Sequence, residues 1–265
     1  MSQWRQKQLT QKKTQKLFKS LAGIMFLLLI GGLALVSVLI SKARGSIWDG
    51  RSFIGVVYQK NSEVKLIAWL PVYKQIYEWE LSGEETVEVP RSFGKYQLKN
   101  VYRLGQLDQH GGELLMRTVQ NNLGIPVRGW QANRASNLTW WDKLRLQILT
   151  WSYKKSPATG NELIFDPKII KEGLSLAILN ASGADGEAKT ISRIVANMGG
   201  EVRMMTNREE QQESEIVVAE DKWLESETVK KISQALKIKQ IKVGQVTDGR
   251  AAIAIIISKD YTQVY

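Results

Sequence analysis

The sequence predicts an α/β (α+β) protein that is anchored in a membrane. Short apolar runs rich in β-branched residues alternate with segments in which apolar residues recur every three to four positions. An uncharged run covers Leu21 to Ile40, and the elements after residue 173 follow the order β-α-β-β-α-β-β. These observations predict five parts: a basic tail at 1–20, a transmembrane helix at 21–41, an α/β domain at 52–156, a linker at 157–172 and a small α/β sandwich at 173–265.

The positive charge is concentrated at the N-terminal end of the chain. The formal net charge is +11, and residues 1–51 contribute nine basic residues against one acid. A nucleic-acid-binding domain would spread its basic residues over a folded surface, so this distribution argues against one. The chain contains no cysteine, which excludes disulfides and thiolate zinc sites.

The uncharged run has the length of a membrane span. At about 1.5 Å per residue a helix over Leu21 to Ile40 is about 30 Å long, which matches a bilayer core. Basic residues precede it with no acid among them: Arg5, Lys7, Lys12, Lys13, Lys16 and Lys19. The positive-inside rule therefore places the N-terminus in the cytoplasm and residues 45–265 outside, as in a single-pass signal anchor of the cell membrane.

Two alternatives for this end stay open. Ser41 and Ala43 resemble the small residues of a signal-peptide cleavage site, although the apolar core of such peptides is shorter, about 7–15 residues. The basic tail is also compatible with nucleic acid, but attraction to the anionic inner leaflet explains it more simply.

The α/β domain begins with predicted strands and continues with helices. Residues 53–58 and 64–70 predict a β-hairpin, and a second strand pair is expected at 75–81 and 86–89. Residues 112–124 have the spacing of an amphipathic helix that ends at a glycine.

A second helix is expected at about 138–152. Thr139 and Asp142 have the spacing of a capping box. One predicted apolar face contains Trp141, Leu144, Ile148 and Trp151. This face either packs in the core, which the pattern favours, or lies at a membrane surface, which the neighbouring basic residues favour.

Three stretches of this domain resemble the LytR-CpsA-Psr cell-envelope family. The run HGGELLMRTVQNNLGIPV at 110–127, the segment GKYQLKNVY at 94–102 and the strand that ends at Pro71 occur in the order typical of that family. The resemblance implies transfer of wall polymers from a polyprenyl-pyrophosphate carrier to peptidoglycan, with arginines on the pyrophosphate and aspartates on magnesium. Such chemistry needs cations against a diphosphate leaving group and carboxylates around a hard metal.

The chain departs from that family at the charged positions. Val72 and Tyr73 stand where the family carries Arg-Asp after the proline, and Gln97 and Lys99 replace its Lys and Asn. None of the matched positions supplies an aspartate. The domain is therefore predicted to be degenerate, with no catalytic residue, no metal site and no cofactor.

Several basic residues remain as candidates for a phosphate ligand. The phosphate contacts that we single out are Arg103, Arg117 and Arg128. An active transferase would require several arginines of the domain to converge on one pocket, with Arg91 and Arg134 among them. Asp108 and His110 lie close together in a glycine-flanked loop, where we expect no third partner.

The segment 173–265 predicts a compact domain that resembles the LytR C-terminal domain family. The resemblance rests on LAILNASGADGEAKTISRIVANMGGEV at its start and AIAIIISKDY near its end. It implies a non-catalytic extracytoplasmic module. Asn180, Asp260 and Tyr261 are the positions where a structural or binding role is expected, and turn formation at strand ends is the simpler role for Asn180 and Asp260.

The glycine-containing turn after the first strand of this domain does not predict a phosphate loop. The Walker and dinucleotide spacings are absent. Asp185 and Glu187 occupy the positive end of the following helix, where they would repel a phosphate.

The favoured function is that of a membrane-anchored, extracytoplasmic bacterial cell-envelope protein without catalytic activity. It would bind or scaffold wall polymers, a polyprenyl lipid or other envelope proteins, with no nucleic-acid partner. The alternative is an active phosphotransferase that moves a wall polymer from a polyprenyl-pyrophosphate carrier to peptidoglycan. A transcriptional regulator ranks last, because the chain has no DNA-reading motif and its cytoplasmic part is about 20 residues long.

Overall fold

The computed structural model describes most of the chain after the N-terminal segment. The described residues are 25, 31–32, 38, 45–91, 93–159, 164–246 and 250–264. The chain separates into two compact units, Met1–Ser46 and Ile47–Tyr265. The predicted transmembrane helix at 21–41 lies almost entirely outside the described residues. No helix within the described part is both long enough and apolar enough to cross a bilayer.

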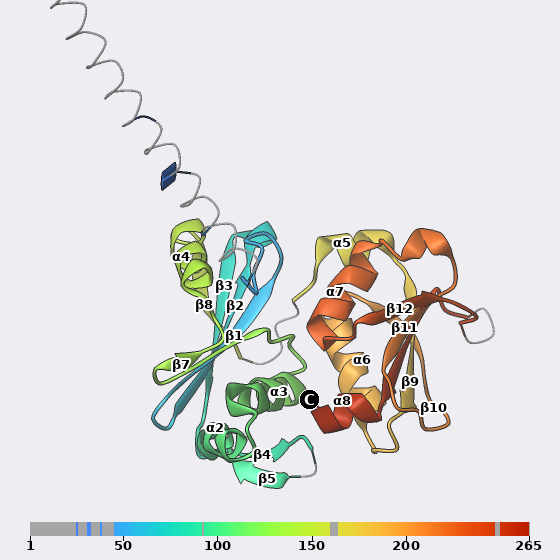
Figure 1. Cartoon of the computed structure of the whole chain (residues 1–265), viewed down its shortest axis with the longest axis horizontal. Helices are drawn as coiled ribbons and strands as arrows, with labels where there is room; N and C mark the ends of the chain where they lie inside the picture. The colour runs from blue at the N-terminus through green and yellow to red at the C-terminus, as the bar shows by residue number, and fades with distance from the viewer. Residues whose placement is uncertain are drawn as a thin grey trace, which may run out of the picture. The chain divides into compact units, whose positions relative to one another are not determined.

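The first sheet has six strands in the order β7-β6-β1-β2-β3-β8 (Figure 1). Its strands are β1 (Ile54–Lys60), β2 (Glu63–Leu70), β3 (Gln75–Leu81), β6 (Gly129–Ala132), β7 (Ala135–Ser136) and β8 (Lys154–Pro157). The predicted hairpin is confirmed, with β1 antiparallel to β2 and Val57 opposite Leu66. Strands β6 and β8 join the sheet in parallel to β1 and β3, respectively.

The predicted pairing of 75–81 with 86–89 is wrong. Strand β3 pairs with β2 over seven residues, with Trp79 opposite Leu66. A short 3-10 helix, η1 (Pro71–Tyr73), reverses the chain between them, and Lys74 follows in the left-handed conformation. Strand β4 (Thr86–Val89) pairs instead with β5 (Gly94–Gln97) as a separate hairpin. The long free edge of β2 offers β3 more ladder bonds than a four-residue partner does.

Helices cover both faces of the first sheet. Helices α2 (Leu98–Leu107) and α3 (Gly111–Leu123) pack on one face, and α4 (Trp140–Leu149) packs on the other. Alternation along the strands creates the two cores, because successive side chains point to opposite faces. Leu66 and Ala68 belong to the core under α2 and α3, whereas Ile67 and Trp69 belong to the core under α4. Helix α2 is absent from the predicted elements.

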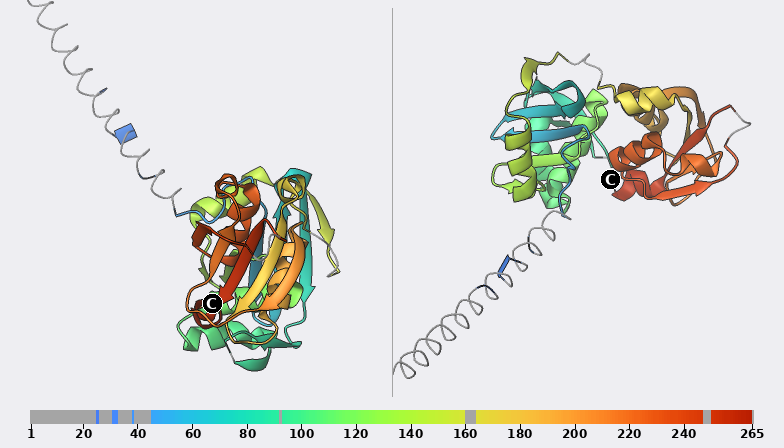
Figure 2. Two further views of the ribbon diagram at one scale, coloured as in Figure 1. Left: turned by 90° about the vertical axis from the view of Figure 1, so that its right-hand side faces the viewer. Right: turned by 90° about the horizontal axis from the view of Figure 1, so that it is seen from above.

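The second sheet has five strands in the order β10-β9-β13-β11-β12. The predicted element order β-α-β-β-α-β-β is confirmed, and Figure 2 shows β13 (red) in the middle of this sheet. The strands are β9 (Ser175–Ala181), β10 (Glu201–Asn207), β11 (Glu215–Val218), β12 (Gln240–Val243) and β13 (Ile253–Ser258). The helical elements of this part are α5 (Pro167–Glu172), α6 (Glu187–Asn197), η2 (Asp221–Trp223), α7 (Glu227–Leu236) and α8 (Lys259–Val264).

Helices α6 and α7 bury one face of the second sheet. Ile191 and Val195 of α6 and Ile232 of α7 pack in a single core with the strand residues Ile178 and Ile255. The stretch 157–172, predicted as a linker, contains the end of β8 and α5. Residues Asp260 and Tyr261, where a structural or binding role is expected, follow β13 and lie in α8.

Candidate functional site

An open groove beside α3 is lined by four basic side chains from the described part of the chain. The groove holds about 440 Å³ of open space. Its basic lining consists of Arg91, His110, Arg117 and Lys237, and Glu113 is the acidic residue among the described residues that line it. Lys237 and Glu113 form an ion pair at 3.1 Å. We call this feature the α3 groove.

Three ionisable side chains form a cluster at one part of the α3 groove. Arg91 forms an ion pair with the Asp108 carboxylate, and His110 Nδ1 lies 3.0 Å from the same carboxylate oxygen. The expectation that Asp108 and His110 have no third partner is therefore wrong. Arg91 reaches them from a backbone with φ of 68°, in the left-handed region. The described residues that line the groove include no hydroxyl or thiol, the groups that most often serve as nucleophiles.

Arg117, a predicted phosphate contact, is engaged inside the protein. Its guanidinium lies 3.8 Å from the ring centroid of Tyr261, and its Nη1 donates a hydrogen bond of 3.2 Å to the Tyr261 carbonyl oxygen. Burial raises the pKa of Tyr261, and the charge of Arg117 opposes that rise. Burial also raises the pKa of nearby Glu187, again opposed by Arg117. Arg117 thus serves as the internal cation for both groups.

The other two predicted phosphate contacts do not join Arg117. Arg128 lines a second cavity of about 380 Å³, and its Nη1 donates to Gln234 Oε1 at 3.3 Å. Burial lowers the pKa of Arg128, and the charges of Asp49 and Asp142 counteract it. Arg103 is exposed on α2 and lines neither cavity.

Two of the five arginines considered for a transferase pocket share a groove. Arg91 and Arg117 both line the α3 groove, whereas Arg134 is exposed and lies in neither cavity. Both groove arginines already have partners, Asp108 and Tyr261. These side chains therefore do not form the compact cluster of available cations that a diphosphate would need.

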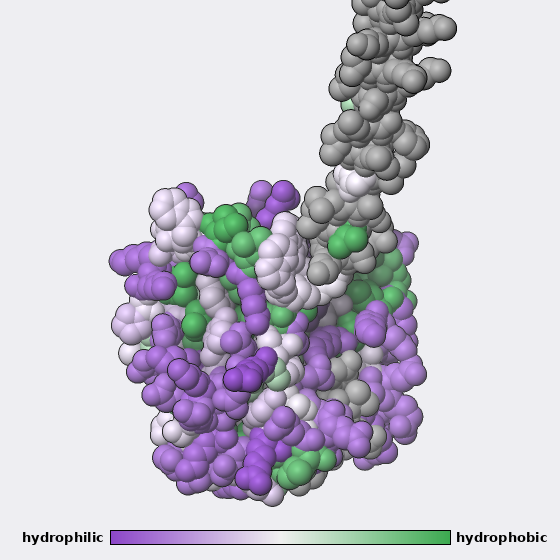
Figure 3. All heavy atoms as spheres, turned by 60° about the vertical axis from the view of Figure 1, so that its left-hand side comes forward, coloured by the Kyte–Doolittle hydropathy of each residue, from purple (hydrophilic) through white to green (hydrophobic). Residues whose placement is uncertain are grey.

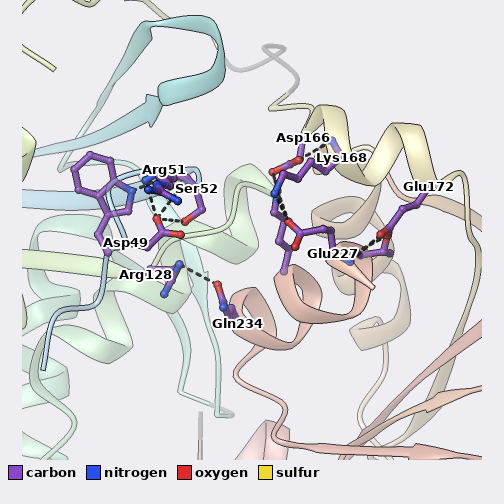
Figure 4. Close-up of polar contacts among 12 residues, drawn as sticks. Asp49, Arg51, Ser52, Arg128, Asp166, Lys168, Glu172, Glu227 and Gln234 are labelled. Carbon is purple, nitrogen blue, oxygen red and sulfur yellow. Dashed lines mark hydrogen bonds and ion pairs between the residues drawn. The ribbon is translucent and has the colours of Figure 1, made fainter. Parts of the chain in front are cut away.

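Charged residues at α5 and α7 pair with one another (Figure 4). Asp166 accepts a hydrogen bond of 2.9 Å from the backbone of Lys168 as the N-cap of α5, and it forms an ion pair with Lys231. The Lys168 ammonium lies 2.7 Å from the Glu227 carboxylate. These contacts join α5 to α7 and compensate charges that are partly removed from water.

Glu172 caps the N-terminus of α7 from outside the helix (Figure 4). Its carboxylate accepts hydrogen bonds from the backbone amides of Glu227 and Thr228, both at 2.8 Å, and from the Thr228 hydroxyl at 2.6 Å. Partial burial acts to raise the pKa of Glu172, but the hydrogen bonds from Thr228 and Glu227 outweigh it and hold the pKa below its usual value. The positive end of the helix favours the same charged form.

Asn180 in β9 and Asp260 in α8 both make structural hydrogen bonds. Asn180 Nδ2 donates to Ala184 O at 2.8 Å, and its Oδ1 accepts from the Ser182 hydroxyl at 2.6 Å. Asp260 Oδ1 accepts from the Ser214 amide at 2.9 Å and from the Tyr261 amide at 2.7 Å. Asn180 shapes the turn after β9, which fits the simpler of its two expected roles, whereas Asp260 connects α8 to Ser214, 46 positions away in sequence.

The end of β2 carries no charge where the resembling family has its Arg-Asp pair. Val72 and Tyr73 lie in η1 with 62% and 50% of their surfaces exposed. They border a cavity of about 230 Å³ whose other walls include Phe53, Ile164 and Phe165. Within the described residues, no three His, Asp or Glu side chains come together as metal ligands.

Helix α4 exposes an apolar surface that the favoured interpretation of the sequence did not expect. Trp140 and Ile148 are 60% and 57% exposed, and Trp151 in the turn after the helix is 84% exposed. The expectation that Ile148 and Trp151 pack in the core is wrong, because Asp142 and Leu146 form the buried side of the helix. In the sequence, the density of tryptophans beside lysines was the feature that indicated an exposed apolar surface. We call the surface of Trp140, Ile148, Leu149 and Trp151 the α4 face.

Comparison with known protein families gives a match for the part of the chain that contains the second sheet. Residues 173–261 match the family described as LytR cell envelope-related transcriptional attenuator. This match confirms the resemblance predicted for that part of the chain, and its description connects the part with the cell envelope. No curated protein matches the sequence.

Solved structures give a weaker likeness. TagU of B. subtilis is 14% identical over 30% of this chain, with a TM-score of 0.26, and the match spans 34% of the length of TagU. TagT of B. subtilis is 11% identical over 82% of this chain and 89% of its own, with a TM-score of 0.27. A further TagT structure, described as a LytR-CPS2A-psr family protein with bound octaprenyl pyrophosphate lipid, is 10% identical over the same shares, also with a TM-score of 0.27. TM-scores this low support no conclusion about fold or function.

Proposed function

We propose that this chain is a non-catalytic cell-envelope protein, held in the cell membrane by residues 21–41, that binds or scaffolds a wall polymer, a polyprenyl lipid or partner proteins. The family match of residues 173–261 supports the envelope assignment. The apolar run and the basic residues before it support the anchor, with residues 45–265 on the extracytoplasmic side.

The uncharged end of β2 carries the non-catalytic part of the proposal. Departure of a diphosphate requires cations or a metal ion against the charge that develops on the leaving group. Val72 and Tyr73 supply neither a cation nor a carboxylate. In the α3 groove, Arg91 is paired with Asp108 and Arg117 with Tyr261.

The absence of cysteine makes the membrane topology directly testable. Single cysteines are introduced at Ser2 in the basic tail and at Ser62, which is exposed in the turn between β1 and β2. A membrane-impermeant maleimide applied to intact cells should label Ser62→Cys and should label Ser2→Cys only after permeabilisation. The reverse pattern would overturn the orientation, and release of the protein by alkaline carbonate would overturn the anchor.

The non-catalytic role is tested with the full chain in detergent. Incubation with Mg²⁺ and a polyprenyl-pyrophosphate substrate should release no more phosphate than a reaction without protein. Release that exceeds this background, and that is lost in Arg117→Met or in Arg128→Met but not in the exposed control Arg103→Met, would establish cleavage of the pyrophosphate and overturn the non-catalytic role.

A further inference from the structure

The α4 face is an apolar surface that the helix cannot turn inward. Its opposite side is fixed, because the Asp142 carboxylate accepts hydrogen bonds from the backbone amides of Ile47 and Trp48, at 3.4 and 3.2 Å. The same carboxylate completes the capping box with Thr139. Arg145 donates to the Trp48 carbonyl oxygen at 2.7 Å. These bonds hold the exposed tryptophans on the outside of the protein.

Exposed lysines flank the α4 face in the sequence. Lys143, Lys154 and Lys155 are exposed, and the sequence from 143 to 161 contains no acidic residue. Tryptophan is enriched where a protein meets the interface of a membrane, and lysine beside it is attracted to anionic headgroups. Figure 3 shows the side of the molecule that carries α4, where hydrophobic and hydrophilic side chains lie close together.

The chain length that precedes α4 limits how far this face can be from a membrane. The backbone amides of Ile47 and Trp48 donate hydrogen bonds to Asp142 of α4. Ile47 lies seven residues after Ile40, which ends the apolar run. A fully extended chain spans at most about 3.6 Å per residue, so this connection covers about 25 Å or less. An anchor that ends at Ile40 therefore keeps α4 near the bilayer surface from which the chain emerges.

We propose that the α4 face docks on the anionic lipid surface of the membrane that holds the anchor, with Trp140, Ile148 and Trp151 inserted at the headgroup boundary. The inference rests on the proposed anchor. Amphipathic helices with aromatic and basic residues insert about 5–10 Å into this boundary. Docking of α4 would fix the orientation of the first sheet relative to the membrane.

The test places a fluorescent probe on α4 in the full chain. Gln147 is exposed in the middle of the helix, and Gln147→Cys labelled with an environment-sensitive dye reports on that surface. Ser62→Cys, at the far end of β1, is the matched control site. Both proteins are reconstituted in vesicles that contain phosphatidylglycerol and a lipid that carries a quencher. We expect at least threefold stronger lipid quenching at residue 147 than at residue 62, with weaker quenching by aqueous iodide.

Two variants separate the α4 face from general effects of substitution. Trp140→Glu combined with Trp151→Glu should reduce lipid quenching of the probe at residue 147 to the level of residue 62. Leu107→Glu changes a residue of α2 that is 79% exposed, and it should leave the quenching unchanged. Thermal unfolding of each variant establishes that the fold is retained.

The outcomes distinguish the docking from the anchor. Carbonate-resistant integration with equal quenching at residues 147 and 62 would overturn the docking and leave the anchor intact. A probe at residue 147 that is shielded from iodide but is not quenched by lipid would identify a second copy of the chain as the occupant and overturn the lipid assignment. Extraction of the chain by carbonate would overturn the anchor and, with it, the docking that depends on the anchor.

Discussion

The guanidinium of Arg117 lies against the ring of Tyr261, 3.8 Å from its centroid, and donates to the carbonyl oxygen of the same residue. Arg117 belongs to α3 under the first sheet, and Tyr261 belongs to α8 after the second sheet. Only 8% of Arg117 and 3% of Tyr261 are exposed. A residue that the sequence marks as a phosphate ligand therefore stabilises the association of two sheets.

Removal of the Arg117 charge should destabilise the protein. Arg117→Met retains much of the aliphatic side chain and loses both the cation–π contact and a charge-assisted hydrogen bond, so we expect the free energy of unfolding to fall by about 1–3 kcal/mol. Urea denaturation of the 47–265 unit measures the change. The control Arg103→Met, at an exposed position of α2, should change it by less than about 0.5 kcal/mol. Equal losses in the two variants would contradict the structural role.

The stability that Glu172 contributes should depend on pH. Its folded-state pKa lies below the ordinary value of 4.5, so the contribution is present above pH 4.5 and is lost as the pH falls through the lower folded value. In Glu172→Gln the acid-side loss of stability should be smaller, because the titrating carboxylate is gone. Urea midpoints measured from pH 7 down to pH 3 test this. Glu225→Gln, whose side chain is 85% exposed, should retain the acid-side slope of the unmodified chain.

The carboxylate of Asp142 should be needed to hold the start of the Ile47–Tyr265 unit. Asp142 has no exposed surface and accepts from the backbone amides of Ile47, Trp48 and Thr139. Asp142→Ala leaves these donors without that acceptor, and we expect a loss of about 2–4 kcal/mol. Limited proteolysis should also cleave the variant near residue 47 at lower protease concentration. Asp185→Ala, an exposed matched change, should behave like the unmodified chain in both measurements.

The close approach of α2 to α3 should not tolerate a methyl group at Gly105. A Cβ at this position would lie 2.3 Å from the carbonyl oxygen of Gly111, and backbone cannot move aside as a side chain can. Alanine favours a helix over glycine by about 1 kcal/mol, but the clash should turn this into a net loss of about 1–3 kcal/mol. Calorimetry would show a lower Tm for Gly105→Ala and an almost unchanged one for Leu107→Ala in the same helix. A raised Tm for Gly105→Ala would rule out this packing.

Elements with a strong local pattern could be predicted, because local sequence alone determines them. The second sheet combines Ile- and Val-rich strands with the apolar stripe of α6, so its order of elements follows from periodicity. Helix α2 carries such a stripe as well, with Leu98, Val101 and Tyr102 buried at helical spacing, but nothing in the sequence marks where the helix begins. Its N-cap, Gln97, makes no side-chain capping bond, and the segment could not be recognised from a cap.

The candidate site could be predicted only in part, because its contacts join distant residues. No local pattern places Arg91 beside Asp108 or Arg117 beside Tyr261. The apolar stripe of α4 was visible in the sequence, but periodicity does not decide which face of a helix is buried. The bonds from Ile47 and Trp48 to Asp142 decide it, and they reverse the expected burial of Ile148.

The central place of β13 has a consequence for how the second sheet assembles. Ile253 pairs with Leu176 of β9 on one side and with Val218 of β11 on the other. The halves β9-α6-β10 and β11-α7-β12 each arise from neighbouring sequence, whereas β13 follows both of them in the chain. Contacts between residues far apart in sequence form slowly. Until β13 inserts, newly made chains present two unpaired apolar strand edges, and this interval is when they are most prone to aggregate.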